Sequence, residues 1–468
     1  MTHDPARSAK KTGALGGSRR EFLGAMTRGI TAAALGATLE TAKAAPPPNA
    51  GTFVATGDTD PRLAAYDSMM MEFMLKYRPP GAALAVSKDG RLVYARGFGF
   101  ADVERQEPAR PLALFRIASI SKPFTSTAVF QLVQQGRLRL DDKVFAILKL
   151  QPFLERGARL DERIHAITVH QCLQHTAGWD RDKGFDPMGA AAAEEVAHAL
   201  GVPLPIGPEH IIRYTMGRPL DWNPGTKYAY SNFGYCVLGR VIEAASGMHY
   251  QDYVTRFVLQ PLGITRMRQG RNLLRDRAPG EVKYYDSMRR TGRAISGPNI
   301  GRQVPLPYGV ECIETMDANG GWIASPIMLV RFADAFNDIR NSKLLDEQSI
   351  RTMLARPPGA PGLENGRPAA AYYGCGWDVR PIAERLGKYT KWHGGLLAGS
   401  STLLVARADG INWAITFNCD ADSAGRSSPR PSTACCTSRR TAPRTGQTGT
   451  CTGSLPCNPF DAKRGRCR

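Results

Sequence analysis

Two pairs of short apolar segments, each pair joined across an Asp-Gly step, limit the folds open to this chain more than any other feature. The pairs are 82–86 with 92–95, around Asp89-Gly90, and 401–405 with 413–417, around Asp409-Gly410. Asp-Gly readily adopts the positive φ angles that tight hairpin turns need, so each pair predicts a β-hairpin. The two hairpins lie near opposite ends of the apolar part of the chain.

The chain between the hairpins has a different pattern. From about 120 to 355 the apolar residues recur mostly at helical spacing, and a helix is also expected at 63–77, before Pro79-Pro80. A further strand is expected at 389–392. We therefore predict an α+β fold in which both ends of the chain build one antiparallel sheet flanked by helices, with a helical insertion at about 125–310.

The overall composition, 43% hydrophobic and 22% charged over 468 residues, is that of a globular protein. No apolar run reaches the roughly 18 residues that a membrane span needs, and ten cysteines are too few for a disulfide scaffold. The net charge of +19 would suit a nucleic-acid partner. Much of the excess, however, lies in 1–44 and 421–468, and the body between them has no basic run, so we expect no nucleic-acid partner.

The first 44 residues have the features of an export signal. The sequence Ser-Arg-Arg-Glu-Phe-Leu at 18–23 resembles the twin-arginine signal of bacteria, a weakly apolar stretch follows, and 42–44 fits a small-residue cleavage site. A tail with a chance arginine pair is the alternative. We expect a mature start near Ala45, export to the bacterial periplasm or the extracellular space, and no stable membrane insertion after signal removal.

Residues 421–468 differ from the rest of the chain. They contain no Val or Ile and a single Leu, so they cannot build much of a core. Half of the ten cysteines lie here: Cys435, Cys436, Cys451, Cys457 and Cys467. A zinc or disulfide knot is one hypothesis, but the segment has no Cys-x-x-Cys pair and no histidine. We favour the hypothesis that this low-complexity, basic, Cys-containing tail is GC-rich coding sequence read out of frame, and that the folded domain is 45–420.

Residues 119–122 form a Ser-x-x-Lys sequence, which alone is weak evidence because a second copy lies in the N-terminal segment. Helical spacing follows, and since Pro123 is tolerated only in the first turn of a helix, the helix must begin near Ser119. The Ser119 hydroxyl then lies at the positive end of the helix dipole, with Lys122 on the same face. A lysine in an apolar site has a lowered pKa and can take the serine proton. A capping serine beside a solvated lysine is the alternative.

Two further segments carry polar groups at short spacing. Tyr230-Ser-Asn232 follows the Pro-Gly step at 224–225, and His393-Gly-Gly395 follows the strand expected at 389–392. Taken singly, the first is typical of an ordinary loop and the second of an ordinary turn.

Together and in this order, the Ser-x-x-Lys at 119, the Tyr-x-Asn at 230 and the His-x-Gly at 393 resemble the signature of the penicillin-recognising serine hydrolases. That family includes class C β-lactamases, D,D-peptidases, D-aminopeptidases and related esterases. The segments 167–178, 224–239 and 320–325 resemble further family segments in the right order, so the resemblance covers most of 45–420. It implies a β-lactamase-like fold and a small ester or amide substrate, and we expect no cofactor and no metal.

The resemblance implies roles for the first two motifs. Ser119 would be the nucleophile that forms an acyl-enzyme. Lys122 and Tyr230 would share the base role, and Tyr230 would pass the proton to the leaving group. Asn232 would orient Lys122 and the acyl side chain.

The third motif would border the substrate from the sheet edge through His393, Gly394 and Gly395. The backbone N–H groups of Ser119 and Leu396 would form the oxyanion hole. β-Lactamases of the family usually have Lys at the position of His393, whereas a histidine with a pKa of about 6.5 is mostly neutral at pH 7. This departure disfavours a dedicated β-lactamase.

We therefore predict a serine hydrolase, first a carboxylesterase, second a D,D-peptidase or D-aminopeptidase, and third a β-lactamase. A catalytically vestigial binding protein on the same fold is the alternative from another class. The sequence leaves the substrate and the oligomeric state open.

The other histidines and cysteines are expected to be structural. His165, His170 and His175 lie five residues apart, which would place them on different helix faces and not in one metal site. Buried free thiols are expected in the body, at Cys172, Cys236, Cys312, Cys375 and Cys419.

The end of the body departs from the family resemblance. A long C-terminal helix packs on the sheet in that family, but nothing after Asn418 can form an amphipathic helix. We expect one sheet face to stay open beside the first helix, with reduced stability or aggregation as the result.

Overall fold

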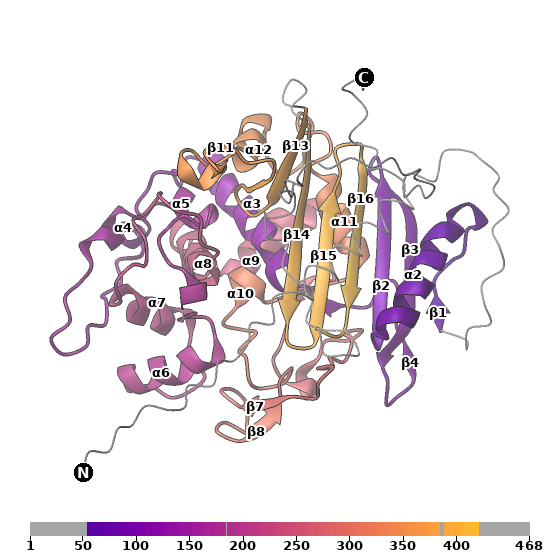
Figure 1. Cartoon of the computed structure of the whole chain (residues 1–468), viewed down its shortest axis with the longest axis horizontal. Coiled ribbons are helices and arrows are strands. Elements are labelled where there is room, and N and C mark those ends of the chain that lie inside the picture. The colour runs from indigo at the N-terminus through magenta and orange to yellow at the C-terminus, as the bar shows by residue number, and fades with distance from the viewer. Residues whose placement is uncertain (1–53, 184, 384–387, 421–468) are drawn as a thin grey trace, which may run out of the picture. The chain divides into compact units, whose positions relative to one another are not determined.

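The structure, a computed structural model, describes residues 54–183, 185–383 and 388–420 (Figure 1). The export signal proposed for 1–44 and the tail at 421–468 lie outside the described residues. Both interpretations therefore stay predictions, as does the domain boundary at 45.

An antiparallel sheet forms the centre of the fold. In spatial order its strands are β1 (Ala55–Thr56), β3 (Arg91–Asp102), β2 (Gly81–Lys88), β16 (Ile411–Phe417), β15 (Ser400–Ala406), β14 (Lys388–Leu397), β13 (Asp378–Ala383) and β12 (Tyr372–Tyr373), and β4 (Glu107–Pro108) pairs with β3. This order places β2 of the first hairpin directly beside β16 of the second. Both ends of the described chain thus build one sheet, and the α+β fold is confirmed.

The Asp-Gly steps make the turns that the sequence predicts. Asp89 and Gly90 have φ angles of 50° and 79°, as a tight hairpin turn of this kind requires. Gly410, in the second turn, has φ 80°. The two turns touch, because the Asp89 N–H donates to the Gly410 carbonyl oxygen at 2.9 Å. Both predicted hairpins are therefore confirmed.

α2 (Ala64–Tyr77) lies on one face of the sheet and is the helix predicted at 63–77 (Figure 1). Its Met70 and Met74 are buried in an apolar cluster with alternate residues of β2, β15 and β16. We expected this face to stay open, but Leu403 and Trp413 on it are 4% and 0% exposed, so that expectation is wrong. The side chains of this face are buried because they pack with one another and with α2 in the same cluster.

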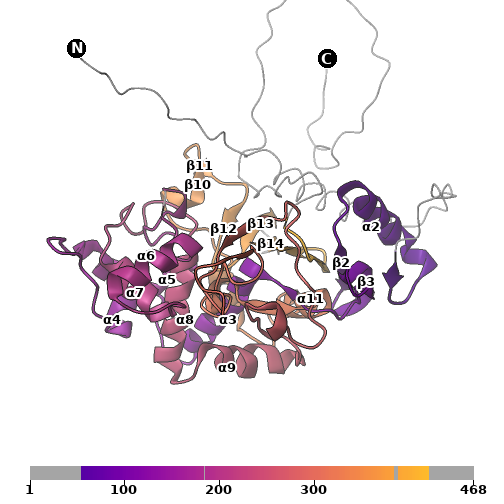
Figure 2. The same cartoon turned by 90° about the horizontal axis from the view of Figure 1, so that it is seen from below.

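The opposite face of the sheet carries a layer of helices. α11 (Pro326–Asp334) packs on β2, β15 and β16, and α3 (Ser121–Gln134) packs behind it through the stacked rings of Phe124 and Phe332, whose centroids are 3.9 Å apart. Further helices extend away from α2 in both views (Figures 1 and 2). They are α4 (Val144–Leu148), α5 (Val169–Leu173), α6 (Ala190–Leu200), α7 (Pro208–Met216), α8 (Asn232–Ser246), α9 (Tyr250–Val254), α10 (Asp317–Gly320) and α12 (Glu347–Met353).

The helical part also contains short strands that the sequence did not predict. β5 (Phe115–Arg116), β9 (Trp322–Ala324) and β6 (Arg268–Gln269) form a small sheet, while β7 (Thr291–Arg293) pairs with β8 (Gln303–Pro305) and β10 (Leu363–Glu364) with β11 (Arg367–Pro368). No helix among the described residues combines the length and the apolar character of a membrane span.

β14 corrects the prediction for the His-Gly-Gly segment. We expected the strand to end at Trp392, but residues 393–397 continue β14 and pair with β15, so the turn that His-Gly-Gly suggests when taken alone does not form. The physical reason lies at Gly395, where an added Cβ would come within 3.0 Å of the Ile117 carbonyl oxygen. The glycine permits close packing of β14 on a neighbouring segment and does not break the strand.

Candidate active site

Ser119 lies in a short 3-10 turn, η2 (Ala118–Ile120), that leads directly into α3. Pro123 is the third residue of α3, in its first turn, so the predicted helix start is confirmed. Ala118, just before Ser119, has φ 49°. A positive φ is uncommon for a residue other than glycine, and such strain is often found at functional sites.

Lys122 is fully buried and has three partners. Its Nζ lies 3.0 Å from Ser119 Oγ, 2.9 Å from Asn232 Oδ1 and 2.9 Å from the carbonyl oxygen of Asn319 in α10. Burial, and next the charge of Arg181, hold the pKa of Lys122 well below its usual value. Both effects favour the uncharged form of the amine.

An uncharged amine has two hydrogens and one lone pair. The Asn232 and Asn319 oxygens are carbonyl oxygens and can only accept, so they take both hydrogens. As the contact stands, Lys122 Nζ donates to Ser119 Oγ; in the uncharged form the lone pair faces that hydroxyl, and the serine donates instead. This arrangement suits the removal of the serine proton by a general base.

Tyr230 completes the polar cluster. It is hydrogen-bonded to Ser119, and burial is the main cause that raises its pKa to about 12, so its hydroxyl keeps its proton at neutral pH. Asn232 is the first residue of α8, which is capped by the Ser231 side chain accepting from the Gly234 N–H. The cap at Ser231 fixes where α8 begins, with Tyr230 just before the cap and Asn232 just after it.

His175 supports Tyr230 from behind. Its Nδ1 accepts from the Ser231 N–H at 3.1 Å, and its ring centroid lies 4.2 Å from that of Tyr230. Burial, followed by the charge of Lys122, holds the pKa of His175 well below its usual value. The imidazole is thus neutral and acts as an acceptor that orders the residues around Tyr230.

His393 lies on β14 and is buried, with 3% of its surface exposed. Its Nδ1 lies 2.8 Å from the Gly394 carbonyl oxygen, which can only accept, so Nδ1 carries the hydrogen. Its Nε2, 3.0 Å from the Tyr373 hydroxyl, then accepts from that hydroxyl. Burial lowers the pKa of His393 to about 3. The sequence predicted a mostly neutral histidine, and the structure places a fully neutral one there.

The glycines of the third motif place β14 against the nucleophile turn. A Cβ on Gly395 would lie 3.1 Å from Ala118 Cβ, and Thr402 on the neighbouring strand donates to the Ile117 carbonyl oxygen at 3.0 Å. Leu396 follows in the same strand and pairs with Ser401. The structure thus brings Ser119, Lys122, Tyr230, Asn232 and the His393–Gly395 strand together, as the sequence predicts. The oxyanion hole formed by the N–H groups of Ser119 and Leu396 stays a prediction.

Three residues at this site did not stand out in the sequence: Asn319, Tyr373 and Arg181. Asn319 contributes a backbone oxygen, which no side-chain pattern can signal. Tyr373 belongs to a two-residue strand, too short for a periodic pattern. The Arg181 guanidinium lies 4.5 Å from the ring centroid of Tyr230, in the turn that follows the family-like segment at 167–178. In the sequence, Arg181 could have been noticed because it lies only three residues after that segment.

The remaining histidine and cysteine predictions have mixed outcomes. His165 lies in η3 (Glu162–Ala166), His170 in α5, and His175 after α5 with φ 57°, so the premise that they share one helix is wrong. The five body cysteines are free thiols, and Cys312 alone among them is only partly buried. No group of three or more His, Cys, Asp or Glu side chains within the described residues is placed to hold a metal ion.

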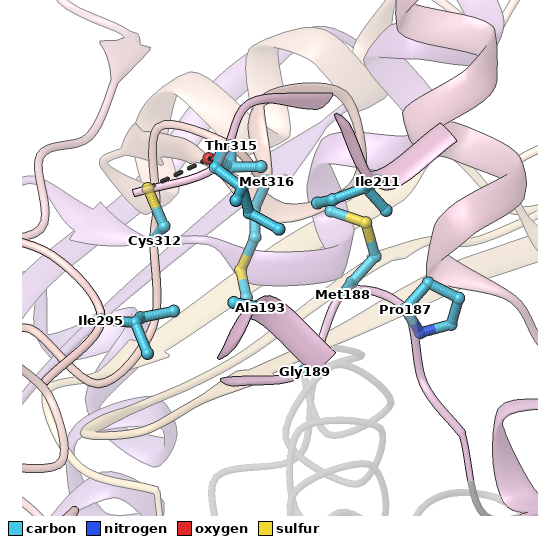
Figure 3. Close-up of a pocket in the computed structure, with 10 residues that line it drawn as sticks. Pro187, Met188, Gly189, Ala193, Ile211, Ile295, Cys312, Thr315 and Met316 are labelled. Atoms are coloured by element: carbon cyan, nitrogen blue, oxygen red, sulfur yellow. Dashed lines mark hydrogen bonds between the residues drawn. The ribbon is translucent and has the colours of Figure 1, made fainter. Parts of the chain in front are cut away.

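A small cavity lies between α6, α7 and the segment before α10 (Figure 3). Its volume is about 20 Å³, and its lining is mostly apolar, including Met188, Ile211 and Met316. The Thr315 hydroxyl at its edge bonds to Cys312 Sγ at 3.0 Å. The cavity contains none of the residues of the polar cluster and is too small for a substrate, so it is a packing defect and not the site.

The polar cluster can now be compared with known proteins. A family model described as Beta-lactamase matches residues 66–432. The chain belongs to the beta-lactamase family. Membership agrees with the α+β fold and with the buried Ser119–Lys122 pair.

Curated relatives match part of the chain. It is 29% identical over 202 residues to "Protein flp" of Staphylococcus aureus strain NCTC 8325, which covers 42% of this chain and 36% of the relative. It is 31% identical over 250 residues to "Esterase EstB" of Burkholderia gladioli, which covers 53% of this chain and 59% of the relative. The chain thus spans less than two thirds of the length of these relatives.

Solved structures share the fold over more of the chain. The octameric penicillin-binding protein homologue from Pyrococcus abyssi is 26% identical, with a TM-score of 0.57 over 77% of this chain and 75% of that one. A D-stereospecific amidohydrolase from a Streptomyces species is 22% identical, with a TM-score of 0.55 over 76% of this chain and 94% of that one. At 22% identity, the match to the amidohydrolase shows a shared fold alone.

Proposed function

We propose that this beta-lactamase family member is a carboxylesterase that forms an acyl-enzyme on Ser119. The observation that carries the proposal is the state of His393. A histidine whose Nε2 accepts from Tyr373 and whose pKa is about 3 cannot supply the positive charge that a β-lactam carboxylate requires. The identity of 31% to an esterase supports the same choice.

The contacts support a two-step mechanism. Lys122 takes the Ser119 proton through its lone pair while Ser119 Oγ attacks the ester carbonyl carbon. The negative charge on the carbonyl oxygen is stabilised by the N–H groups of Ser119 and Leu396. Tyr230, already hydrogen-bonded to Ser119, gives its proton to the departing alcohol oxygen as the carbon–oxygen bond breaks, and it regains a proton from Lys122.

The second step reverses these roles. A water molecule gives a proton to the same pair and attacks the acyl carbon, the bond to Ser119 Oγ breaks, and the serine regains its proton. One ester and one water give one alcohol and one carboxylic acid. The small ester is the partner we propose, and export to the periplasm or beyond stays part of the proposal.

The test compares the full chain with its Ser119→Ala variant on p-nitrophenyl butyrate, D-alanine p-nitroanilide and a chromogenic cephalosporin. Ser246→Ala, at the far end of α8, is the matched serine control. We expect turnover of the butyrate ester in the wild type and the control, and loss of at least 1,000-fold in Ser119→Ala, on the order seen for removed nucleophiles.

Other outcomes would overturn parts of the proposal. Faster turnover of the anilide or the cephalosporin would replace the esterase with a peptidase or a β-lactamase on the same nucleophile. A folded wild type with no turnover and no acyl adduct on Ser119 would show a vestigial site.

A further inference from the structure

Arg181 is a largely buried cation whose guanidinium makes no hydrogen bond among the described residues. Its side chain is 11% exposed, and its Nε and Nη2 are shielded from solvent with no hydrogen-bond partner among the described residues. Its nearest carboxylate, on Asp182, is 3.8 Å from Nε and 77% exposed. At that distance the pair is an ion pair without a hydrogen bond, and water screens the exposed partner.

A structural arginine elsewhere in the chain looks different. Arg116 is 1% exposed, and its Nη1 and Nη2 donate to the carbonyl oxygens of Pro307 and Arg271 at 2.7 and 2.9 Å. These hydrogen bonds offset the free-energy cost of removing the guanidinium from water. The polar groups around Arg181 offer no such compensation, so its charge acts on whatever lies closest to it.

The ring of Tyr230 lies under that charge, with its centroid 4.5 Å from the guanidinium carbon. Lys122 Nζ lies 4.8 Å from the same Tyr230 centroid. Arg181 therefore contacts the ring of a member of the Tyr230–Ser119–Lys122 proton relay. A cation in this position favours loss of a proton from Tyr230 and disfavours gain of one by Lys122.

We propose that Arg181 is a positioning residue for catalysis, whose uncompensated charge strengthens Tyr230 as the proton donor to the leaving group and keeps Lys122 in its uncharged, proton-accepting form. This inference rests on the proposed roles of Ser119, Lys122 and Tyr230. It adds to them a cation from an element outside the three motifs.

The electrostatic surroundings agree with this direction. Arg181 is the largest influence that lowers the pKa of Tyr230, and after burial it is the largest that lowers the pKa of Lys122. Two acidic residues act the other way: Asp378 and Asp186 raise the pKa of Tyr230, and Asp186 also raises that of Lys122. The rings in contact with Tyr230 include those of His175, Tyr373 and His393, and both histidines are neutral. Tyr228 and Tyr235 also interact electrostatically with Tyr230.

The size of the effect follows from Coulomb's law. Two unit charges about 6 Å apart, at an effective dielectric constant of about 20, shift a pKa by about two pH units. Loss of the charge would raise the pKa values of both Tyr230 and Lys122. The acid limb of the kcat/KM profile, set by protonation of Lys122, would then move to higher pH.

The test uses Arg181→Met and Arg181→Gln, which remove the charge, and Arg181→Lys, which keeps it. Lys183→Met is the matched control, because Lys183 lies in the same turn and stacks on Trp222 at 3.9 Å, away from the relay. Each full-length variant is measured on p-nitrophenyl butyrate and on ethyl butyrate across pH. A p-nitrophenolate leaves without a proton, whereas an ethoxide needs one from Tyr230.

We expect the acid limb to move up by about one to two pH units in Arg181→Met and Arg181→Gln. We also expect ethyl butyrate turnover to fall about 10-fold more than p-nitrophenyl butyrate turnover, since only the alkyl ester depends on the acidity of Tyr230. Arg181→Lys should restore much of both, and Lys183→Met should match the wild type.

Two results would overturn the inference. One is a pH profile of either neutral variant that superimposes on the wild type. The other is an equal loss on both esters with no movement of the limb, which would indicate a purely structural residue. Using two neutral variants keeps the test decisive if one of them fails to fold. The proposed function fails separately, if Ser119→Ala retains turnover.

Discussion

Gly395→Ala tests the close approach of β14 to the nucleophile turn. The new Cβ would come within 3.0 Å of both the Ile117 carbonyl oxygen and Thr402 Oγ1, a separation that folded proteins essentially never show. Both atoms belong to one hydrogen bond, so the strand must move and that bond must lengthen or break. Because Ile117 and Ala118 lead directly into Ser119, the displacement reaches the nucleophile.

The expected loss of stability can be worked from these contacts. Overpacking of a well-packed interior costs about 1–3 kcal/mol, and loss of the Thr402–Ile117 hydrogen bond costs about 1 kcal/mol more. Replacing glycine with alanine returns about 0.4–1 kcal/mol through the unfolded chain. We expect Gly395→Ala to lower the free energy of unfolding by about 2 kcal/mol. We expect kcat/KM to fall about 100-fold, because small misplacements of reacting groups are expensive.

Gly394→Ala is the matched control in the same strand. The nearest atom to its new Cβ is the Thr402 carbonyl oxygen at 3.8 Å, an ordinary contact. Urea unfolding should leave this variant within about 0.5 kcal/mol of the wild type. Equal stability and activity of the two variants would refute the proposed packing of β14 on the Ser119 turn.

Ala118, Tyr373 and Lys391 give three further predictions. Ala118→Gly should raise the free energy of unfolding by about 1 kcal/mol in urea, since glycine adopts φ 49° without strain, and should lower kcat if that strain holds the nucleophile in place. Tyr373→Phe should cost about 1–3 kcal/mol in the same assay, because His393 Nε2 would be left buried without a donor. Burial lowers the pKa of Lys391 to about 8, so the folded state binds fewer protons than the unfolded one, and wild-type stability should rise between about pH 8 and pH 10.5. Lys391→Met should remove that rise and be more stable than the wild type at pH 7 by up to about 3 kcal/mol, and urea unfolding at pH 7 and pH 10.5 checks both statements.

The parts of the fold that the sequence predicts correctly depend on local rules. Asp89-Gly90 selects a hairpin turn, and Pro123 limits where the helix behind Ser119 can begin. Both features act within a few residues, so they can be recognised without knowing what packs against them. That both hairpins join one sheet was predicted from their positions in the chain, while the pairing of β2 with β16 comes from the structure.

The errors concern residues whose structure is decided by distant partners. The strand was expected to end at Trp392, yet it continues through Gly394 and Gly395, where the backbone at Ile117, far away in sequence, leaves no room for a Cβ on Gly395. The sheet face with Leu403 and Trp413 was expected to be open because no amphipathic helix follows it. Packing within one apolar cluster, which no local pattern encodes, buries these side chains instead.

The buried lysine shows why the site needs both parts of the fold. Its two carbonyl partners come from α8 and α10 in the helical part, while its serine partner belongs to the turn that packs on β14 of the sheet. If Lys122 gained a proton, a third hydrogen would need an acceptor, and the partner left for it is Ser119 Oγ. The serine would then accept from the amine and could no longer donate to it. The protonation state of the amine therefore sets the direction of the Ser119 proton, and a shift of either part of the fold would disturb both at once.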